Sequence, residues 1–177
     1  MKQLVATITL AAFPLLLGPL AAQQNNASRL KTADANFADK AAQGGMAEVE
    51  LGKMAAKKAK DPKVKQFGQR MVDDHTKIND QLKSIATNKG LTLPTMLDSK
   101  DEALKNKLSS LQGEEFDKTY MENMVSDHEK DISDFQHEAD HGQDADLKAF
   151  AQKNLPTLQT HLQLAKDALA DVKKTGQ

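Results

Sequence analysis

Four long segments of this chain place apolar residues three and four positions apart, the spacing that puts side chains on one face of an α-helix. They run from about Ala33 to just before Asp61, from Pro62 to Lys89, from about Glu114 to Asp140, and from about Asp144 to Val172. The sequence has one tyrosine and no tryptophan, and such a low aromatic content also favours helices over sheets. The pattern predicts an all-α protein.

The ends of these helices carry recognisable signals. Asp34 is expected to cap the first helix, Pro62 suits the first turn of the second, and Gly90 should end the second. The pattern breaks after Gly90, where Ser99 or Asp101 is expected to cap a short helix. Because this connection is longer than a hairpin needs, it should cross the length of the bundle and make its flanking long helices parallel.

A repeat relates the two helical pairs to each other. The segment Asp61-Pro-Lys-Val-Lys-Gln-Phe-Gly-Gln-Arg resembles Asp144-Ala-Asp-Leu-Lys-Ala-Phe-Ala-Gln-Lys, and each begins the second helix of its pair. Duplicated hairpins joined by a crossover make a four-helix bundle. We therefore predict a four-helix bundle of two helical hairpins over residues 33–175, with a long crossover that carries a short helix.

The N-terminal segment has the pattern of a secretory signal peptide over residues 1–22. Lys2 precedes an apolar run over residues 4–20, and small residues end it at Ala22. A retained membrane anchor is the alternative, but Pro14 and Pro19 interrupt the run below the length of a spanning helix. We expect a disordered leader over 23–32, no transmembrane segment in the mature form, and a periplasmic or secreted location with outer-membrane association left open.

Composition excludes several classes of function. The formal net charge is −1 and basic residues alternate with acidic ones, so the chain lacks the basic footprint of a nucleic-acid-binding protein. There is no cysteine, which excludes disulfides and thiol nucleophiles. No glycine-rich phosphate loop follows a strand. A homo-oligomer or an envelope partner remains open.

One phrase occurs twice, as Met71-Val-Asp-Asp-His75 and as Met124-Val-Ser-Asp-His128. Each histidine takes a place where the apolar stripe of its helix calls for an aliphatic residue. Glu48 and His161 interrupt the stripes of the other two long helices in the same way. Glu48, His75 and His128 each lie roughly 20 Å from a hairpin turn at 1.5 Å per residue, and His161 lies about one helical turn further from its own, so the four are expected to meet near mid-bundle.

Two interpretations fit this inward polar set. Glu48, His75, His128 and His161 are candidate ligands of a metal ion, because unpaired they would cost several kcal/mol in an apolar core. Further candidate ligands nearby are Met71, Met124, Asp74 and Asp127. Glutamate and histidine alone would favour zinc, iron or manganese, whereas added methionine sulfur would favour copper; methionines on a helical stripe are, however, more often packing residues.

The alternative is a metal-free polar layer in a structural or interaction module. Glu48 would then pair with one histidine, while Asn154 and the carbonyl freed by Pro156 would serve the others. This interpretation predicts that replacing His75 and His128 together by leucine leaves stability unchanged or raised. The metal interpretation predicts a near-stoichiometric ion that is lost when either of these histidines becomes alanine.

The segment His137-Glu138-Ala139-Asp140-His141 matches the H-E-x-x-H motif of zinc metalloproteases. The stripe of its helix centres on His128 and Phe135, which places His137 and His141 on the opposite, solvated face. We therefore expect no protease site, although the exposed pair could bind zinc adventitiously.

Several phrases in this sequence resemble a bacterial envelope family of ferritin-like fold, the domain of unknown function 4142, whose members are sometimes called outer membrane proteins. The matching phrases are Ala41 to Lys53, Asp61 to His75, Tyr120-Met with Met124 to His128, and Leu155-Pro-Thr-Leu with His161. The resemblance implies the bundle fold but no established activity. Di-iron ferritins need Glu-x-x-His pairs on two helices, and the one such spacing here, Glu138 to His141, is expected to face outward.

Together these features predict an exported bundle with a central Glu/His layer that binds a metal ion in a redox or stress-related role, more as a binding protein than as an enzyme. A metal-dependent oxidoreductase is a distant alternative, because it needs an open, water-accessible coordination position.

Overall fold

The computed structural model describes residues 32–175, and these residues form an all-helical protein. The helices are α1 (Thr32–Lys58), α2 (Pro62–Lys89), α3 (Ser99–Ser110), α4 (Gly113–His141) and α5 (Ala145–Thr175). The expected signal segment and most of the expected leader lie outside the described residues. None of the helices described is long and apolar enough to cross a membrane.

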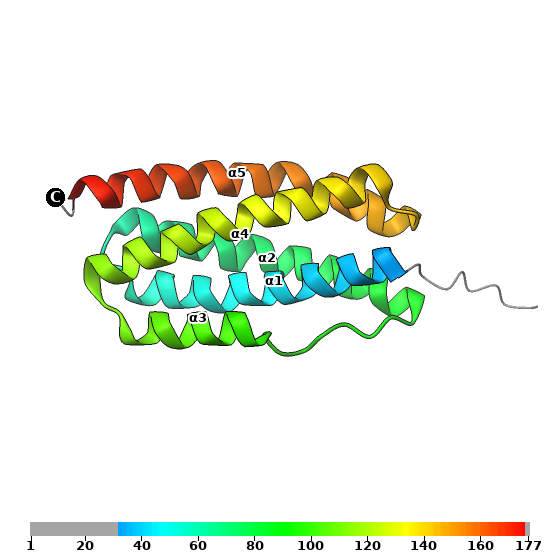
Figure 1. The fold of residues 1–177 in the computed structure, drawn as a ribbon, viewed down its shortest axis with the longest axis horizontal. Helices are drawn as coiled ribbons and strands as arrows, with labels where there is room; N and C mark the ends of the chain where they lie inside the picture. Colours follow the sequence, from blue (N-terminus) through cyan, green and yellow to red (C-terminus); the bar gives the residue numbers. More distant parts are fainter. Residues whose placement is uncertain (1–31, 176–177) are drawn as a thin grey trace, which may run out of the picture.

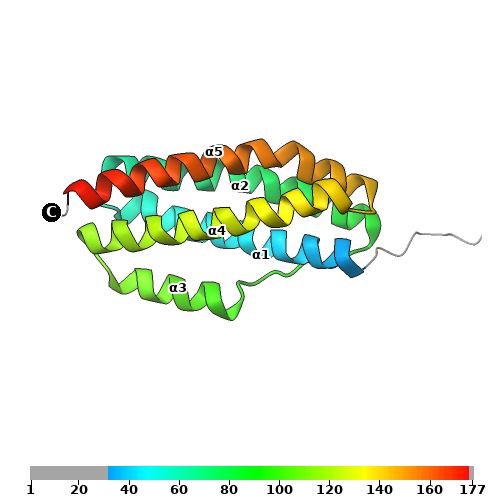
Figure 2. The same ribbon diagram turned by 45° about the horizontal axis from the view of Figure 1, so that its top comes forward.

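The four long helices form a bundle of two hairpins, as the sequence predicted. The pairs α1 with α2 and α4 with α5 make the most extensive contacts, and α1 also packs on α4 and α2 on α5. Helices α2 and α4 run in the same direction, because the chain returns along the bundle through the linker after Gly90 and through α3 (Figure 1). Helix α3 lies outside the bundle, beside α1 and α4 (Figure 2).

Two helix starts differ from the sequence prediction. Asp98 caps α3, where its side chain accepts a 2.8 Å hydrogen bond from the backbone N–H of Asp101, so neither Ser99 nor Asp101 is the cap. Asp34 lies inside the first turn of α1 rather than at its cap. The other signals act as expected, with Pro62 in the first turn of α2 and Gly90 ending that helix in the left-handed conformation.

Asp34 instead joins the two hairpins to each other. Its buried carboxylate accepts hydrogen bonds from the backbone N–H groups of Gln143 and Asp144, both 3.1 Å long, in the α4–α5 turn. At the opposite end, Asp117 of α4 accepts from Lys60 at 3.0 Å and Asp61 at 2.7 Å in the α1–α2 turn. Asp34 and Asp117 are 83 residues apart, as are Asp61 and Asp144. The duplicated hairpins therefore share this contact, in which an aspartate of each hairpin binds the turn of the other.

Replacing Asp117 by alanine is expected to lower the free energy of unfolding by about 3 kcal/mol, because two N–H groups of a part-buried turn lose a charged acceptor. Urea denaturation measures this change. The control is Asp167→Ala, which removes an exposed aspartate of α5 and should change stability by less than about 0.5 kcal/mol. Equal effects of the two substitutions would contradict the interlocking role.

The apolar core is divided into two clusters along the bundle. One cluster lies toward the α1–α2 turn and includes Leu51, Met71 and Met124. The other lies toward the α4–α5 turn and includes Leu82 and Phe135. In each long helix the residues of the two clusters are separated by one buried polar residue. A single polar layer therefore crosses the middle of the bundle.

Candidate metal centre

The polar layer contains one residue from each long helix: Glu48 of α1, His75 of α2, His128 of α4 and His161 of α5. Burial of these side chains is almost complete, with 2% exposure for Glu48, 3% for His75 and none for His128 or His161. Helical periodicity places them here, since each occupies an inward position that an aliphatic residue would otherwise fill. The structure thus brings together all four residues that the sequence analysis put first.

The three histidine rings converge. The ring centroids of His75 and His128 are 5.8 Å apart, and His161 lies 5.4 Å from each of them. Each ring offers one nitrogen, and these three nitrogens all lie within 4.8 Å of one another. Three nitrogens bound to one ion at about 2.1 Å stand roughly 3.5 Å apart, so ring movements of about 1 Å would close the set around an ion.

Hydrogen bonds on the outer side of two rings determine which nitrogen carries the proton. His128 Nδ1 lies 2.9 Å from the carbonyl oxygen of Met124, which can only accept, so this nitrogen is the donor. His161 Nε2 lies 3.1 Å from Asp74 Oδ2 and likewise donates to the carboxylate. The remaining nitrogens, His128 Nε2 and His161 Nδ1, therefore present lone pairs. Both are buried without a hydrogen-bond partner within residues 32–175, as is His75 Nε2.

Burial keeps these imidazoles neutral. Desolvation, helped by the two other rings, holds the pKa of His75 well below its usual value. Desolvation and the neighbouring His161 lower the pKa of His128 to about 4. Desolvation also lowers the pKa of His161, although Asp74 opposes that shift. Neutral imidazole is the form that binds a metal ion, so at neutral pH the site needs no proton removed from these rings.

Glu48 lies behind His128 rather than among the three converging nitrogens. Its Oε1 is 3.5 Å from His128 Nδ1, the nitrogen that donates to the Met124 carbonyl, and its Oε2 is buried without a hydrogen-bond partner among the described residues. Burial, followed by the nearby Asp131, raises the pKa of Glu48 well above its usual value. In this arrangement Glu48 supports the orientation of His128, and the group able to hold an ion among the described residues consists of the three histidines.

The further candidate ligands take different places. Asp74, in the first copy of the repeated phrase, orients His161. Asp127, in the second copy, contacts none of the histidines through a described hydrogen bond and instead forms a 3.1 Å ion pair with Lys100 of α3. Met71 and Met124 are fully buried in the apolar cluster next to the layer. The two copies of the phrase therefore share the inward histidine but use their aspartates differently.

Asn154 and Pro156 do not serve the histidines as the metal-free interpretation expected. The side-chain amide of Asn154 donates to the carbonyl oxygen of Phe150 at 2.8 Å, within its own helix. The three converging nitrogens have no hydrogen-bond partner among the described residues. Glu48 does pair with one histidine, as that interpretation proposed.

The H-E-x-x-H segment lies in the last turns of α4, away from the polar layer. His137 and His141 are exposed, as predicted, and their ring centroids are 5.0 Å apart. Glu138 was expected to face outward and is instead buried, because its position also falls beside the α4–α5 turn, where Asp34 is bound. A protease would need the two histidines and the glutamate on one accessible face, which this helix does not provide.

Glu138→Gln is expected to stabilise the protein at alkaline pH but not at acid pH. Burial, with Asp34 and Asp144 nearby, raises the pKa of Glu138 from 4.5 to about 7. Between these values the unfolded chain releases a proton that the folded chain retains, so the wild type loses stability as pH rises. The variant should therefore gain about 2 to 3 kcal/mol relative to wild type between pH 4.5 and pH 8.

Urea denaturation at the two pH values measures this difference for Glu138→Gln. Glu129→Gln, which removes an exposed carboxylate of the same helix, is the control and should show no such change. A stability difference for Glu138→Gln that stays constant between the two pH values would refute the assignment.

Two residues of the layer's surroundings were missed by the sequence analysis. Tyr120 is fully buried, its hydroxyl has no partner among the described residues, and the nearby Glu48 adds to the burial that raises its pKa. Asp131 lies one turn after His128, and burial raises its pKa to about 7 despite the opposing charge of Lys130. Tyr120 lies four residues before Met124, and this spacing indicated that Tyr120 also faces inward. Nothing in the apolar pattern indicated Asp131.

Comparison with known families places this architecture. The profile of the family described as a domain of unknown function (DUF4142) matches residues 19–168, most of the chain. The chain belongs to the DUF4142 family. This match confirms the resemblance noted from the sequence, and it spans all four residues of the polar layer. A comparison with curated proteins gives no match.

Solved structures of other families share the fold of this DUF4142 protein. A DUF305 fragment from Deinococcus radiodurans has a TM-score of 0.71 at 12% identity, over 80% of this chain and 98% of the fragment. A DUF305 protein from Streptomyces coelicolor, named as a candidate secreted protein, has a TM-score of 0.68 at 16% identity, over 80% and 94%. A conserved hypothetical protein from Mycobacterium tuberculosis has a TM-score of 0.56 at 14% identity, over 78% and 91%.

Proposed function

We propose that this DUF4142 protein binds one transition-metal ion through His75 Nε2, His128 Nε2 and His161 Nδ1. The observation that carries the proposal is the proton arrangement of the layer. Two of the three converging nitrogens are lone-pair acceptors, because their rings donate from the other nitrogen. At most one ring, His75, could offer a proton to them, so neutral imidazoles alone leave acceptors unpaired. One cation satisfies all three nitrogens.

The outer partners also support a metal site. Metal-binding histidines usually donate their second N–H to a carboxylate or a backbone carbonyl, which fixes the ring and raises the basicity of the ligating nitrogen. Asp74 and the Met124 carbonyl provide these two kinds of partner for His161 and His128. A set of three imidazole nitrogens suits zinc or copper better than manganese, which prefers oxygen. We propose binding or transport of the ion rather than catalysis.

The test is calorimetric unfolding of untagged protein, first in chelator and then with excess zinc or copper. At about a thousand times the Kd, the ion should stabilise the fold by about 4 kcal/mol and raise the Tm by about 10 °C. His128→Ala should lose this gain, whereas the control His137→Ala/His141→Ala, which removes the exposed pair, should retain it. No gain in wild type, or a gain that persists in His128→Ala, would overturn the proposal.

A second candidate is a metal-free layer that encloses one water molecule. Such a water could donate to His128 Nε2 and His161 Nδ1 and accept from His75 Nε2, which would satisfy the same three nitrogens. This candidate predicts no response of stability to either ion in the calorimetric test.

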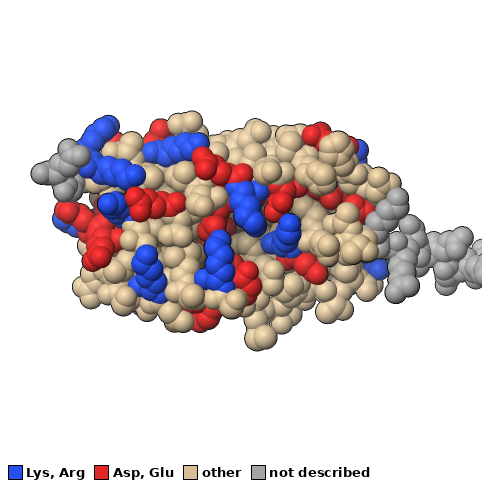
Figure 3. Space-filling model, viewed as in Figure 1, with Lys and Arg blue, Asp and Glu red and all other residues tan. Residues whose placement is uncertain are grey.

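We also propose that the protein is exported. The charged start, apolar run and small residues over 1–22 support a cleaved signal, and the described residues contain no helix able to span a membrane. Figure 3 shows acidic and basic side chains interleaved over one face of the bundle, which suits a protein exposed to solvent. Cell fractionation with N-terminal sequencing tests the proposal: the mature protein should begin near residue 23, and a cytoplasmic full-length chain would overturn it.

A further inference from the structure

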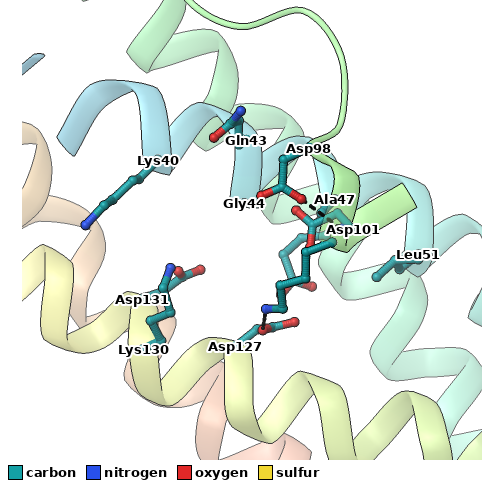
Figure 4. A pocket seen from close by; sticks show the side chains of 12 residues that line it. Lys40, Gln43, Gly44, Ala47, Leu51, Asp98, Asp101, Asp127, Lys130 and Asp131 are labelled. Carbon is teal, nitrogen blue, oxygen red and sulfur yellow. Dashed lines mark hydrogen bonds and ion pairs between the residues drawn. The ribbon is translucent and has the colours of Figure 1, made fainter. Parts of the chain in front are cut away.

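A hollow lined by acidic groups opens between α1, the start of α3 and α4. It has a volume of about 170 Å³. Asp101 of α3 and Asp127 and Asp131 of α4 contribute carboxyl groups to its walls (Figure 4). We call this space the acidic hollow. None of the three histidines lines the acidic hollow, although the hollow adjoins the same polar layer of the bundle.

Glu48 connects the acidic hollow to the histidines. It lines the hollow with a side chain that is 3% exposed, and its Oε2 has no hydrogen-bond partner in the part of the chain that the structure describes. Its other oxygen lies 3.5 Å from His128 Nδ1. An unpaired carboxyl oxygen buried at the end of an acidic space is a costly arrangement unless a cation or a donor uses it.

Asp131 approaches the same part of α1. A Cβ added at Gly44 would lie 3.5 Å from Asp131 Oδ2, so this carboxylate reaches the helix one turn before Glu48. Lys40 and Lys130 also line the hollow, but both ammonium groups pair with Asp134, which does not line it. Carboxyl groups outnumber lysines in the lining of the hollow, where Glu48, Asp98, Asp101, Asp127 and Asp131 stand against Lys40, Lys100 and Lys130.

We propose that the acidic hollow is the site at which the metal ion first binds, and that Glu48 and Asp131 hold it there before it passes to the three histidines. This inference rests on the proposed function. Carboxylate oxygens attract a hydrated cation and can replace some of its water ligands. A cleft of one charge sign also raises the local cation concentration. The buried histidines then provide the nitrogen ligands that retain a transition metal.

Lys100 limits access to the acidic hollow. Its ammonium group forms a 3.1 Å ion pair with Asp127 Oδ1 and thereby joins the first turn of α3 to α4, and both residues line the hollow. The lysine side chain is 67% exposed, so the pair can open at small cost. Lys100→Met removes a positive charge from the rim and frees Asp127, and it should raise the rate of metal uptake several-fold.

The experiment is stopped-flow transfer of zinc from a chelating dye to the full chain, with uptake rate and equilibrium affinity measured for each variant. Glu48→Gln and Asp131→Asn should each lower the uptake rate about tenfold, while one zinc per chain still binds at equilibrium. Release should slow with uptake, because the ion leaves by the same route. Asp140→Asn, an exposed change of equal charge at the far end of α4, is the matched control and should leave the rate unchanged.

The outcomes separate this inference from the proposed function. Uptake rates that match the control, with zinc still bound by the histidines, would overturn the inference and leave the proposed function standing. A loss of affinity without a change in uptake rate would also overturn it, because Glu48 and Asp131 would then act only on the bound ion and not on its entry. If the wild type binds no zinc at all, the proposed function fails and the inference fails with it. Circular dichroism confirms that each variant is folded.

Discussion

The double substitution His75→Leu/His128→Leu is expected to abolish the gain in stability from zinc or copper. The metal-free variant should be as stable as wild type or more stable. Each histidine places an unpartnered nitrogen in the core, and leucine fills a similar volume without a polar atom. In chelator the change in the free energy of unfolding should lie between zero and a gain of about 4 kcal/mol, and the ion should add nothing further. Urea denaturation with and without metal measures both quantities.

Stability in chelator and the response of stability to metal test different properties of the layer. Unchanged or raised stability in chelator is expected for a metal site and for a metal-free layer alike, so only the response to metal separates them. His137→Leu/His141→Leu is the control, because it removes two exposed histidines of α4 and should preserve the response. A double variant at positions 75 and 128 that is several kcal/mol less stable in chelator would show that the histidines stabilise the core by themselves.

Gly68→Ala is expected to destabilise the protein by about 3 kcal/mol. The backbones of α1 and α2 touch at Gly52 and Gly68, where an added Cβ on Gly68 would lie 2.7 Å from Ala55 Cβ and 2.8 Å from both Ala56 N and Gly52 O. Backbone atoms cannot move aside as a flexible side chain can, so the helices must separate. Separation would also shift Glu48 relative to His75 and weaken metal binding.

The control for this prediction is alanine at position 44, another glycine within α1. A Cβ there would meet Asp131 Oδ2 at 3.5 Å, an ordinary contact, and alanine is the better helix former by about 1 kcal/mol. Gly44→Ala should therefore be neutral or stabilising. Thermal unfolding compares the two variants, and equal Tm changes would refute the close approach at Gly68.

Helical periodicity was sufficient to predict most of the fold. It located four long helices, and the long connection after Gly90 correctly predicted that α2 and α4 run in parallel. It did not predict the role of Asp34, because an aspartate near a helix start has the same local signature whether it caps that helix or another turn. Only the constant spacing of 83 residues between Asp34 and Asp117, and between Asp61 and Asp144, carried that information.

Helical periodicity also predicted that the four polar residues lie in one layer. It did not predict which of them face the centre of that layer. Periodicity gives the direction of a side chain from its helix, and it does not give the rotamer that turns one ring nitrogen inward. For this reason Glu48 ranked equally with the histidines as a ligand, whereas the structure places it at the outer nitrogen of His128. The acidic hollow was not foreseen because its walls come from three helices, one of them the short α3.

Anomalous diffraction from crystals of the zinc-loaded, untagged protein would locate the bound ion itself. One strong peak should lie inside the bundle, about 2.1 Å from His75 Nε2, His128 Nε2 and His161 Nδ1. A peak found only at the exposed His137 and His141, or no peak among the three buried rings at saturating zinc, would contradict the proposed metal site.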